Sequence, residues 1–304
     1  MEKKISELIV EIKQKNWRSL AKAITIVENE LSGSQEILKS INFNHRTPVI
    51  GITGPPGAGK STIVNALIED LLKTPTNTIG IVAIDPTSPF NFGSVLGDRV
   101  RMAQHFNNER VYIRSIATRG SLGGLSGKTI EITDVMQLAG FSHIIIETVG
   151  VGQSEIEIVG LADATILVLV PEAGDEVQTI KSGIMEIADI FVVNKSDRNG
   201  ANTFVKNLAH LVHKKHGENY ASQIIKTVAT KNEGIHELNS AIVKHLSYQI
   251  QNSKKNFLLA EKAFELIQHK MMKRIDKKDL IERIEIAKKN NAFNLYVFVN
   301  DYLI

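Results

Sequence analysis

One stretch of the sequence limits the possible folds more than any other. The apolar segment Val49–Thr53 runs into the loop Gly-Pro-Pro-Gly-Ala-Gly-Lys-Ser at residues 54–61, and an amphipathic segment, Ser61–Lys73, follows. A strand, a Gly-x-x-x-x-Gly-Lys-Ser loop and a helix in this order are typical of a phosphate-binding loop. Glycines let backbone N–H groups surround a phosphate, because side chains there would block its close approach. The loop predicts a domain that binds a nucleoside triphosphate.

The chemistry of this loop suits a triphosphate that carries a metal ion. The loop directs an anion toward a helix N-terminus, where unpaired N–H groups and the helix dipole favour negative charge. We expect Lys60 to contact the β- and γ-phosphates and the Ser61 hydroxyl to bind Mg²⁺. The candidate nucleotide-binding residues of the loop are Gly54, Pro55, Pro56, Gly57, Ala58, Gly59, Lys60, Ser61 and Thr62.

The surrounding segments predict an α/β fold. Short runs rich in Ile and Val, without polar alternation, are typical of parallel strands buried on both faces. The predicted strands are Val49–Thr53, Ile79–Ile84, His143–Glu147, Thr165–Val170 and Ile190–Val193. Amphipathic segments between them include Ser61–Lys73, Thr129–Ala139 and Val177–Ala188. The alternation predicts a doubly wound, mostly parallel sheet with its ligand site at the carboxyl ends of the strands.

Helical patterns extend this domain at both ends. The predicted N-terminal faces are Ile5, Leu8, Ile9 and Ile12 in one helix, and Leu20, Ile24, Val27 and Leu31 in a second. Gly33 is predicted to end the second helix. The chain is therefore divided into a helical segment at 1–44, a domain with the phosphate-binding loop (P-loop) at 45–250 and a helical arm at 251–304.

The C-terminal arm has two interpretations. Its apolar residues are Phe264, Ile267, Met271 and Ile275 at helical spacing, followed by Phe293, Leu295, Tyr296, Val297 and Phe298. An apolar helical tail of this kind either packs on the domain or holds two copies of the chain together.

Composition excludes several classes of protein. The 36 basic and 33 acidic residues give a net charge of +3, which is too even to indicate a nucleic acid or an anionic membrane as a partner. The chain has no cysteine, which excludes disulfides and thiolate metal sites. The N-terminal residues 1–15 lack the apolar core of a signal peptide. The most apolar run, Ile166–Val170, is far shorter than the roughly 20 residues of a membrane span. We expect a cytoplasmic protein.

A second motif predicts which base is bound. The strand Ile190–Val193 ends in Asn-Lys-Ser-Asp at residues 194–197, the Asn-Lys-x-Asp pattern of guanine-specific GTPases. The Asp197 carboxylate is able to accept hydrogen bonds from the N1–H and the exocyclic amine of guanine, whereas adenine offers no such pair of donors. The predicted base-contact residues are Asn194, Lys195 and Asp197, with Val228, Ala229 and Thr230 as a loop whose main-chain N–H backs the base.

Acidic residues at strand ends predict the metal site. Asp85 follows Ile79–Ile84, and Glu147 ends His143–Glu147, so both are expected at the carboxyl edge of the sheet. Asp98 is a third candidate, with helix N-capping as its alternative role. Gly150 is predicted to donate its N–H to the γ-phosphate and to act as a pivot. With Ser61, the acids Asp85, Asp98 and Glu147 make up the predicted Mg²⁺ site, and Lys60 and Glu147 are catalytic candidates.

The residue after Gly150 predicts slow hydrolysis. It is Val151, where other GTPases have a glutamine that orients water, and Gln153 comes later. We expect a partner or a dimer contact to stimulate the reaction.

Five longer motifs, in this order, resemble the MeaB/ArgK family of P-loop GTPases. They are Asp-Pro-Thr-Ser-Pro at 85–89, Gly-Ser-Val-Leu-Gly-Asp-Arg-Val-Arg-Met at 93–102, Arg-Gly-Ser-Leu-Gly-Gly-Leu at 119–125, Glu-Thr-Val-Gly-Val-Gly-Gln-Ser-Glu at 147–155 and Pro-Glu-Ala-Gly-Asp-Glu-Val-Gln at 171–178. Residues 48–200 carry the resemblance most closely. Members of this family, which include a human relative, the methylmalonic aciduria type A protein, are G-protein chaperones of adenosylcobalamin-dependent acyl-CoA mutases.

The resemblance implies a homodimeric GTPase that binds GTP, GDP and Mg²⁺ and gates cofactor loading, protection or reactivation of a mutase. It implies metal roles for Asp85, Asp98 and Glu147. The segment Val170–Lys181 corresponds to an additional switch loop, in which the residues implicated in coupling are Asp175, Gln178 and Lys181, with Lys181 stabilising charge. From the residues alone, Asp175 and Lys181 also fit a solvated helix start. The C-terminal arm corresponds to a dimerisation element.

Two alternative functions remain at this stage. A nickel-delivery GTPase shares the same broad class, but its relatives usually have His-rich or Cys sites, whereas the nine histidines here are scattered. A kinase linked to amino-acid transport is the other alternative, because family members have been labelled so. The sequence does not identify which mutase is the partner.

Overall fold

A computed structural model of the chain describes residues 2–42, 46–85, 102–117, 127–148, 158–172, 188–216, 223–249, 260, 263–264, 266–268, 270–272, 275–289 and 293–302. The chain forms two compact units, residues 1–258 and 259–304. The domain boundaries that the sequence suggested after residues 44 and 250 stay predictions.

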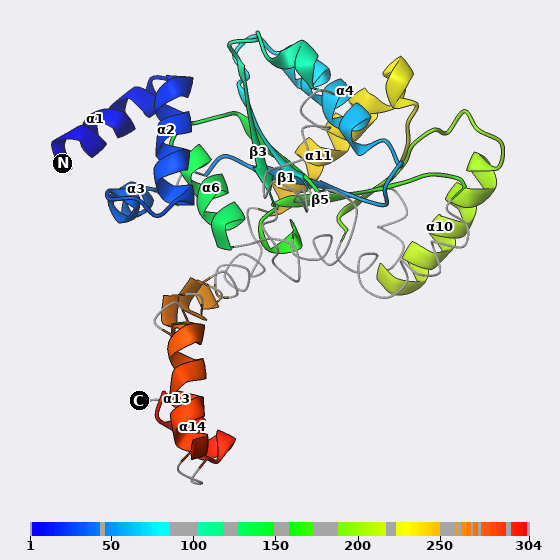
Figure 1. The fold of residues 1–304 in the computed structure, drawn as a ribbon. Coiled ribbons are helices and arrows are strands. Elements are labelled where there is room, and N and C mark those ends of the chain that lie inside the picture. Colours follow the sequence, from blue (N-terminus) through cyan, green and yellow to red (C-terminus); the bar gives the residue numbers. More distant parts are fainter. Residues whose placement is uncertain are drawn as a thin grey trace. The chain divides into compact units, whose positions relative to one another are not determined.

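The larger unit is built on a seven-stranded sheet (Figure 1). Its strands are β1 (Val49–Thr53), β2 (Ile79–Asp85), β3 (Val111–Ala117), β4 (His143–Glu147), β5 (Ala164–Leu169), β6 (Ile190–Val193) and β7 (Ile224–Lys226). The order across the sheet is β3-β2-β4-β1-β5-β6-β7, and every paired strand is parallel to its neighbour. The first strand therefore lies in the middle, between β4 and β5, where the order changes direction. Ligands of open α/β sheets bind at the carboxyl ends of the strands at such a point.

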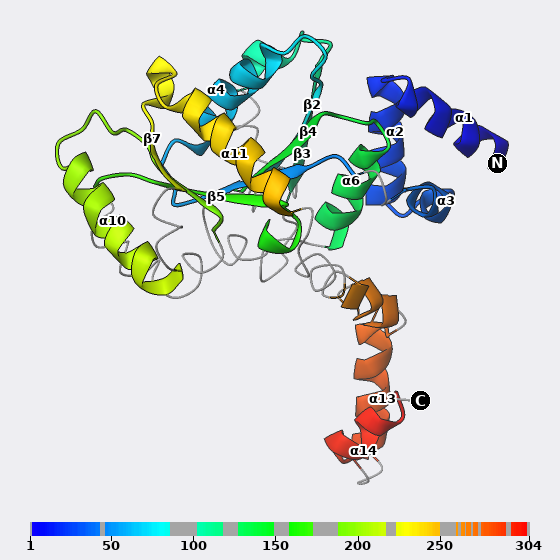
Figure 2. The ribbon, with the colours of Figure 1, turned by 180° about the vertical axis from the view of Figure 1, so that it is seen from behind.

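Helices cover both faces of this sheet. In both views of the ribbon, α4 (Lys60–Leu72) and α11 (Ile235–Gln249) lie side by side on one face (Figure 2). The opposite face is covered at one end by α6 (Gly127–Gln137) and at the other by α10 (Ala201–His216). All residues of β1, β5 and β6 are buried, because alternate side chains enter the cores on the two faces. The doubly wound, parallel α/β fold predicted from the sequence is confirmed.

Most predicted elements match, and two strands were missed. The bounds of β1, β4 and β6 are as predicted, whereas β5 begins and ends one residue earlier than predicted. Neither β3 nor β7 was predicted as a strand. Helices α4 and α6 correspond to the predicted Ser61–Lys73 and Thr129–Ala139. The predicted helix Val177–Ala188 lies outside the described residues, apart from Ala188.

The N-terminal helices pack on the sheet face that α6 covers. They are α1 (Glu2–Lys13), α2 (Trp17–Glu28) and α3 (Ser34–Lys39). Asn16 caps α2, since its side-chain oxygen accepts hydrogen bonds from the N–H groups of Arg18 and Ser19. The predicted apolar faces enter the same core as the sheet, except that Leu31 is 51% exposed.

The predicted end of the second helix was wrong. Helix α2 ends at Glu28, and Gly33, with a φ of 97°, precedes the first residue of α3. A glycine in the left-handed region is compatible with either end of a helix, so its position alone did not decide between the two roles. Leu31 lies between the helices, which explains its exposure.

An aromatic cluster anchors α2 to the sheet. The ring centroids of Trp17 and Phe141 are 5.1 Å apart, and those of Trp17 and Tyr112 are 5.9 Å apart. The indole Nε1 of Trp17 donates a hydrogen bond of 2.8 Å to the Glu109 carbonyl. Burial raises the pKa of Tyr112 to about 12, since the ionised phenolate is poorly solvated there.

This shift predicts a pH-dependent loss of stability. Tyr112 ionises near pH 10 in the unfolded chain and near pH 12 in the folded protein, so the stability present below pH 10 declines as the pH rises to 12. The loss amounts to about 2–3 kcal/mol. Replacing Tyr112 with Phe should remove this part of the decline. Urea unfolding of both proteins between pH 9 and 12 tests it, and parallel stability curves would contradict it.

The smaller unit contains α13 (Lys277–Lys289) and α14 (Leu295–Asn300). Asn294 caps α14 by accepting hydrogen bonds from the N–H groups of Tyr296 and Val297. Several apolar side chains of this unit are exposed, as in Phe264 at 64% and Tyr296 at 81%, whereas Phe293 and Phe298 are half-buried. Of the helices that the structure describes, none has the length and apolarity to cross a membrane.

Candidate functional site

The phosphate loop is shaped by three glycines between β1 and α4. Gly54, Gly57 and Gly59 have φ values of 143°, 77° and 89°, in the region that favours glycine. A Cβ on Gly54 would lie 2.1 Å from the Val168 carbonyl oxygen, whereas a Cβ on Gly57 would meet nothing within 4 Å. The loop is therefore fixed against β5 at its start and open at its middle.

Because Gly54 is packed against β5 and Gly57 is not, an alanine should lower the free energy of unfolding more at position 54 than at position 57. Replacing Gly54 with Ala combines an unfavourable φ with a backbone clash and should lower the free energy of unfolding by about 3 kcal/mol or more. Replacing Gly57 with Ala adds only the cost of the left-handed conformation, about 1–2 kcal/mol. Urea denaturation measures both, and equal losses would contradict the proposed fit of the loop against β5.

Lys60, the first residue of α4, lies within the curve of the loop. Its ammonium donates hydrogen bonds to the carbonyls of Gly54 at 2.8 Å and Pro55 at 3.1 Å, and the residue is 7% exposed. The loop carbonyls thus hold a buried positive charge beside backbone that is open at Gly57. This is the electrostatic arrangement that a polyphosphate requires.

Ser61 and Glu147 come together beneath the loop. The Ser61 hydroxyl donates a 2.6 Å hydrogen bond to Glu147 Oε1, and both residues are buried. Glu147 is the last residue of β4, which pairs with β1, so the sheet fixes the carboxylate under the start of α4. Beside them, the Thr148 hydroxyl contacts Thr53 Oγ1 at 3.0 Å.

These two oxygen donors fit Mg²⁺. The ion prefers carboxylate and hydroxyl oxygens and usually completes its octahedron with waters and substrate phosphates. Within the described part of the chain, no three His, Asp or Glu side chains form a metal-binding group. Asp85 ends β2 beside β4, but its side chain is not described, and Asp98 lies outside the described residues. Gly150, Asp175, Gln178 and Lys181 also lie outside them.

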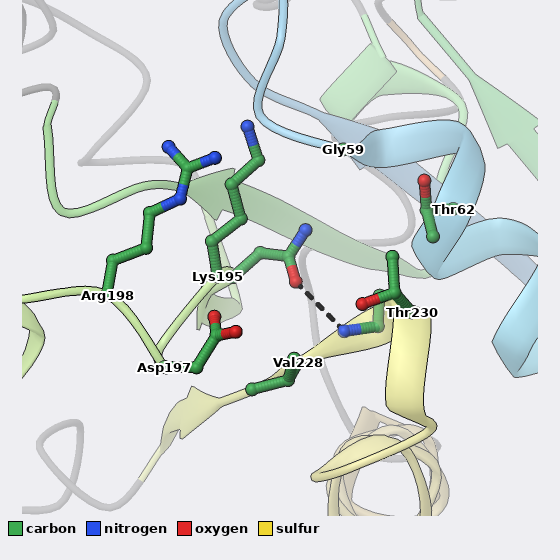
Figure 3. A pocket seen from close by; sticks show the side chains of 9 residues that line it. Gly59, Thr62, Lys195, Asp197, Arg198, Val228 and Thr230 are labelled. Carbon is green, nitrogen blue, oxygen red and sulfur yellow. Dashed lines mark hydrogen bonds between the residues drawn. The ribbon is translucent and has the colours of Figure 1, made fainter.

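A pocket of about 190 Å³ adjoins the loop, at the carboxyl ends of β6 and β7 (Figure 3). Its lining residues come from the α4 start, the segment after β6 and the loop after β7. They are Gly59, Thr62, Asn194, Lys195, Asp197, Arg198, Val228, Ala229 and Thr230. The structure thus brings together every base-contact residue predicted from the sequence, and places Thr62 beside them.

Asn194 connects the three parts of this pocket. Its amide nitrogen donates to the Ala58 carbonyl at 2.9 Å, and its amide oxygen accepts from the Thr227 hydroxyl at 3.1 Å and the Ala229 N–H at 3.2 Å. Lys195, at a φ of 56°, donates to the Gly57 carbonyl at 2.8 Å. The segment after β6 therefore holds the phosphate loop and the loop after β7 in one rigid arrangement.

The remaining pocket residues differ in how firmly they are held. Asp197 is half-exposed, with Lys231 Nζ 3.8 Å from its Oδ2. In the loop predicted to back the base, the Ala229 N–H donates a hydrogen bond to the side-chain oxygen of Asn194.

The sequence did not point to two residues of this region, Thr227 and Arg198. Arg198 had a signal, since it directly follows the Asn-Lys-Ser-Asp motif, whereas Thr227 had none.

Comparison with known proteins decides the family. The model of the family described as "Methylmalonyl Co-A mutase-associated GTPase MeaB" matches residues 20–285. The chain belongs to the MeaB family. It is a GTPase, and GTPase ArgK of Escherichia coli is 35% identical to it over 254 residues, 79% of this chain and 75% of ArgK. A candidate GTPase of Pyrococcus horikoshii is 46% identical over 263 residues, 85% of this chain and 81% of the relative.

A solved structure supports the fold of this MeaB-family GTPase. A crystal structure described as LAO/AO transport system kinase superposes with a TM-score of 0.69 at 24% identity, covering 99% of this chain and 97% of the other. At this identity the likeness shows the fold alone. Together with the phosphate loop and the pocket, membership of the MeaB family makes guanine nucleotide the ligand class of the site.

Proposed function

We propose that this MeaB-family GTPase is a chaperone that binds an adenosylcobalamin-dependent acyl-CoA mutase and gates the loading, protection or reactivation of its cofactor. The family description, which names association with methylmalonyl-CoA mutase, supports the choice of partner. The observation that carries the switch is the contact between Ser61 and Glu147. It joins the phosphate loop to the last residue of β4, and the proposed switch acts from this contact on the chain that follows Glu147.

The proposed roles within the site follow from the contacts. Lys60 neutralises the charge that develops on the phosphates, and the backbone N–H groups of loop residues 57–61, which follow the two prolines, surround them. Ser61 and Glu147 would hold Mg²⁺, with Asp85 and Asp98 as further acids, and the ion would supply positive charge beside the phosphates. Asp197 binds the guanine edge, and Asn194 and Lys195 fix its position. Val228, Ala229 and Thr230 form the opposite side of the base pocket.

Other parts of the proposal rest on the family. Gly150 is the proposed γ-phosphate contact, and Asp175, Gln178 and Lys181 couple the mutase to hydrolysis. Two copies of the chain are proposed to associate through the arm at 251–304, in the cytoplasm. The strongly exposed apolar side chains of that arm support an interface role.

Affinity capture tests the partner. A mutase that depends on adenosylcobalamin should bind the immobilised protein with a non-hydrolysable GTP analogue and bind differently with GDP, because only the former fills the γ-phosphate position. Equal or absent binding in both states would contradict the proposal. With GTP labelled at the γ-phosphate, label should be released as free phosphate. Label on a protein would instead favour the kinase alternative, and tight Ni²⁺ binding in equilibrium dialysis would favour the nickel-delivery alternative.

A further inference from the structure

Arg198 is a cation on the wall of the base pocket that the proposed roles do not use. It lines the pocket beside Asp197 and Lys195 (Figure 3). Its backbone N–H donates to the Lys195 carbonyl at 3.1 Å, and its own carbonyl accepts from the Ala201 N–H at 3.3 Å. The backbone at this position is thus held by the turn that leads into α10. The side chain is half-exposed, at 50%.

A carboxylate from the neighbouring strand end meets this guanidinium. Strands β5 and β6 pair with Leu169 opposite Val193, and the Asn194 N–H donates to the Leu169 carbonyl at 2.8 Å. The chain therefore leaves both strands at the same edge of the sheet. Three residues after β5, the Glu172 carboxylate accepts a hydrogen bond from Arg198 Nη1. This bond lowers the pKa of the Glu172 carboxyl below its usual value.

Stability does not explain this pair. Ion pairs between half-exposed side chains contribute little to the free energy of folding. A long side chain that is ordered in advance, however, loses less conformational entropy when a ligand contacts it. Guanidinium groups also stack on aromatic and base faces, because their planar charge is weakly hydrated. An arginine that is fixed at the edge of a purine pocket therefore has a specific use.

We propose that Arg198 is a further nucleotide-contact residue, whose guanidinium lies against the face of the purine, and that Glu172 is the residue that positions it. The inference rests on the proposed guanine-nucleotide site and deepens it. Asp197 contacts the edge of the base and distinguishes guanine from other bases. A contact to the face is shared by all purines, so Arg198 adds affinity without adding selectivity.

Nucleotide affinity in a set of variants tests these roles. Dissociation constants for fluorescent GDP should rise about 5- to 20-fold in Arg198→Ala and about 2- to 10-fold in Glu172→Gln, which leaves Arg198 unordered. The dissociation constant of Arg198→Lys should lie between those of the wild type and Arg198→Ala, because lysine keeps the charge but not the planar group. Glu172→Gln should add no loss to Arg198→Ala, since Glu172 acts through Arg198. The preference for GTP over ATP should stay unchanged in all of them.

The control matches the exposure of the test residue. Arg283 pairs with Asp279 in α13, and their side chains are 58% and 52% exposed, but this pair lies in the smaller unit. Arg283→Ala should bind GDP as the wild type does. Thermal unfolding of each variant identifies any loss of fold, and if Arg198→Ala unfolds, Arg198→Lys takes its place.

Exchanging the two charged residues tests whether Arg198 contacts the nucleotide directly or only stabilises the loop through its ion pair with Glu172. Arg198→Glu combined with Glu172→Arg keeps the ion pair but removes the guanidinium from position 198. Affinity should stay as low as in Arg198→Ala. Recovery to the wild-type value would show that the pair only braces the loop, and would overturn the proposal, as would wild-type affinity in Arg198→Ala. If the wild type does not bind GDP, the proposed guanine-nucleotide site is wrong. If the wild type binds GDP and Arg198→Ala binds it equally well, only the inference about Arg198 is wrong.

Discussion

Replacing Lys60 with alanine is expected to slow GTP hydrolysis about 100- to 1,000-fold, the usual cost of removing one preorganised charge from a transition state. The ammonium of Lys60 is buried and held by the Gly54 and Pro55 carbonyls, so its position is fixed before nucleotide binds. No reorganisation is needed when negative charge develops on the phosphates. Single-turnover phosphate release at saturating GTP measures the effect on the chemical step.

Lys73 provides the matched control for this substitution. It lies directly after α4, pairs with Asp70 and is 75% exposed at its side chain. Lys73→Ala removes the same charge from the opposite end of the helix and should leave hydrolysis unchanged. Hydrolysis by Lys60→Ala within about threefold of the wild-type rate would contradict the role proposed for Lys60.

Replacing Asp197 with asparagine is expected to change the preferred base from guanine to xanthine. The carboxylate accepts from two donors of guanine, whereas an asparagine amide presents one acceptor and one donor group. Its donor would face the exocyclic amine of guanine but would match the carbonyl that xanthine has at that position. Affinity for GTP should therefore fall about 100-fold or more, with affinity for xanthosine triphosphate rising above it.

Competition for a fluorescent nucleotide among GTP, ATP and xanthosine triphosphate measures this exchange. Asp279→Asn is the control, because Asp279 is exposed to a similar degree, 52% against 46% for Asp197, and lies in the smaller unit. An Asp197→Asn protein that still prefers GTP would show that a different group selects the base.

Much of the candidate site was predictable because its residues follow strands of a parallel sheet. Glu147 ends β4 and Asn194 follows β6, so topology alone placed both at one edge of the sheet. Ser61 and Glu147 lie 86 positions apart, yet the motif and the strand end placed both of them in one predicted Mg²⁺ site, and in the structure they are in contact. Buried apolar runs and glycine spacing are local signals, and each of them could be read directly from the sequence.

Features that depend on distant partners could not be predicted in this way. Strand β3 was missed because Arg114 and Ser115 interrupt its apolar pattern. The charge of Arg114 is balanced by Glu28 of α2, which lies 86 residues earlier in the chain. The Thr227 hydroxyl likewise reaches the pocket through its hydrogen bond to Asn194, 33 residues earlier in the chain. In each case the contacting residue is distant in the sequence and is brought near only by the fold, so the local pattern of apolar residues gives no information about it.

In the proposed function, a mutase controls GTP hydrolysis by this protein. The most direct test is phosphate release from GTP, measured with and without purified adenosylcobalamin-dependent mutases acting on methylmalonyl-CoA and on isobutyryl-CoA. The proposed function predicts that one of them raises turnover several-fold or more in the wild type and has no effect in Lys60→Ala. Unchanged turnover with every such mutase would contradict it.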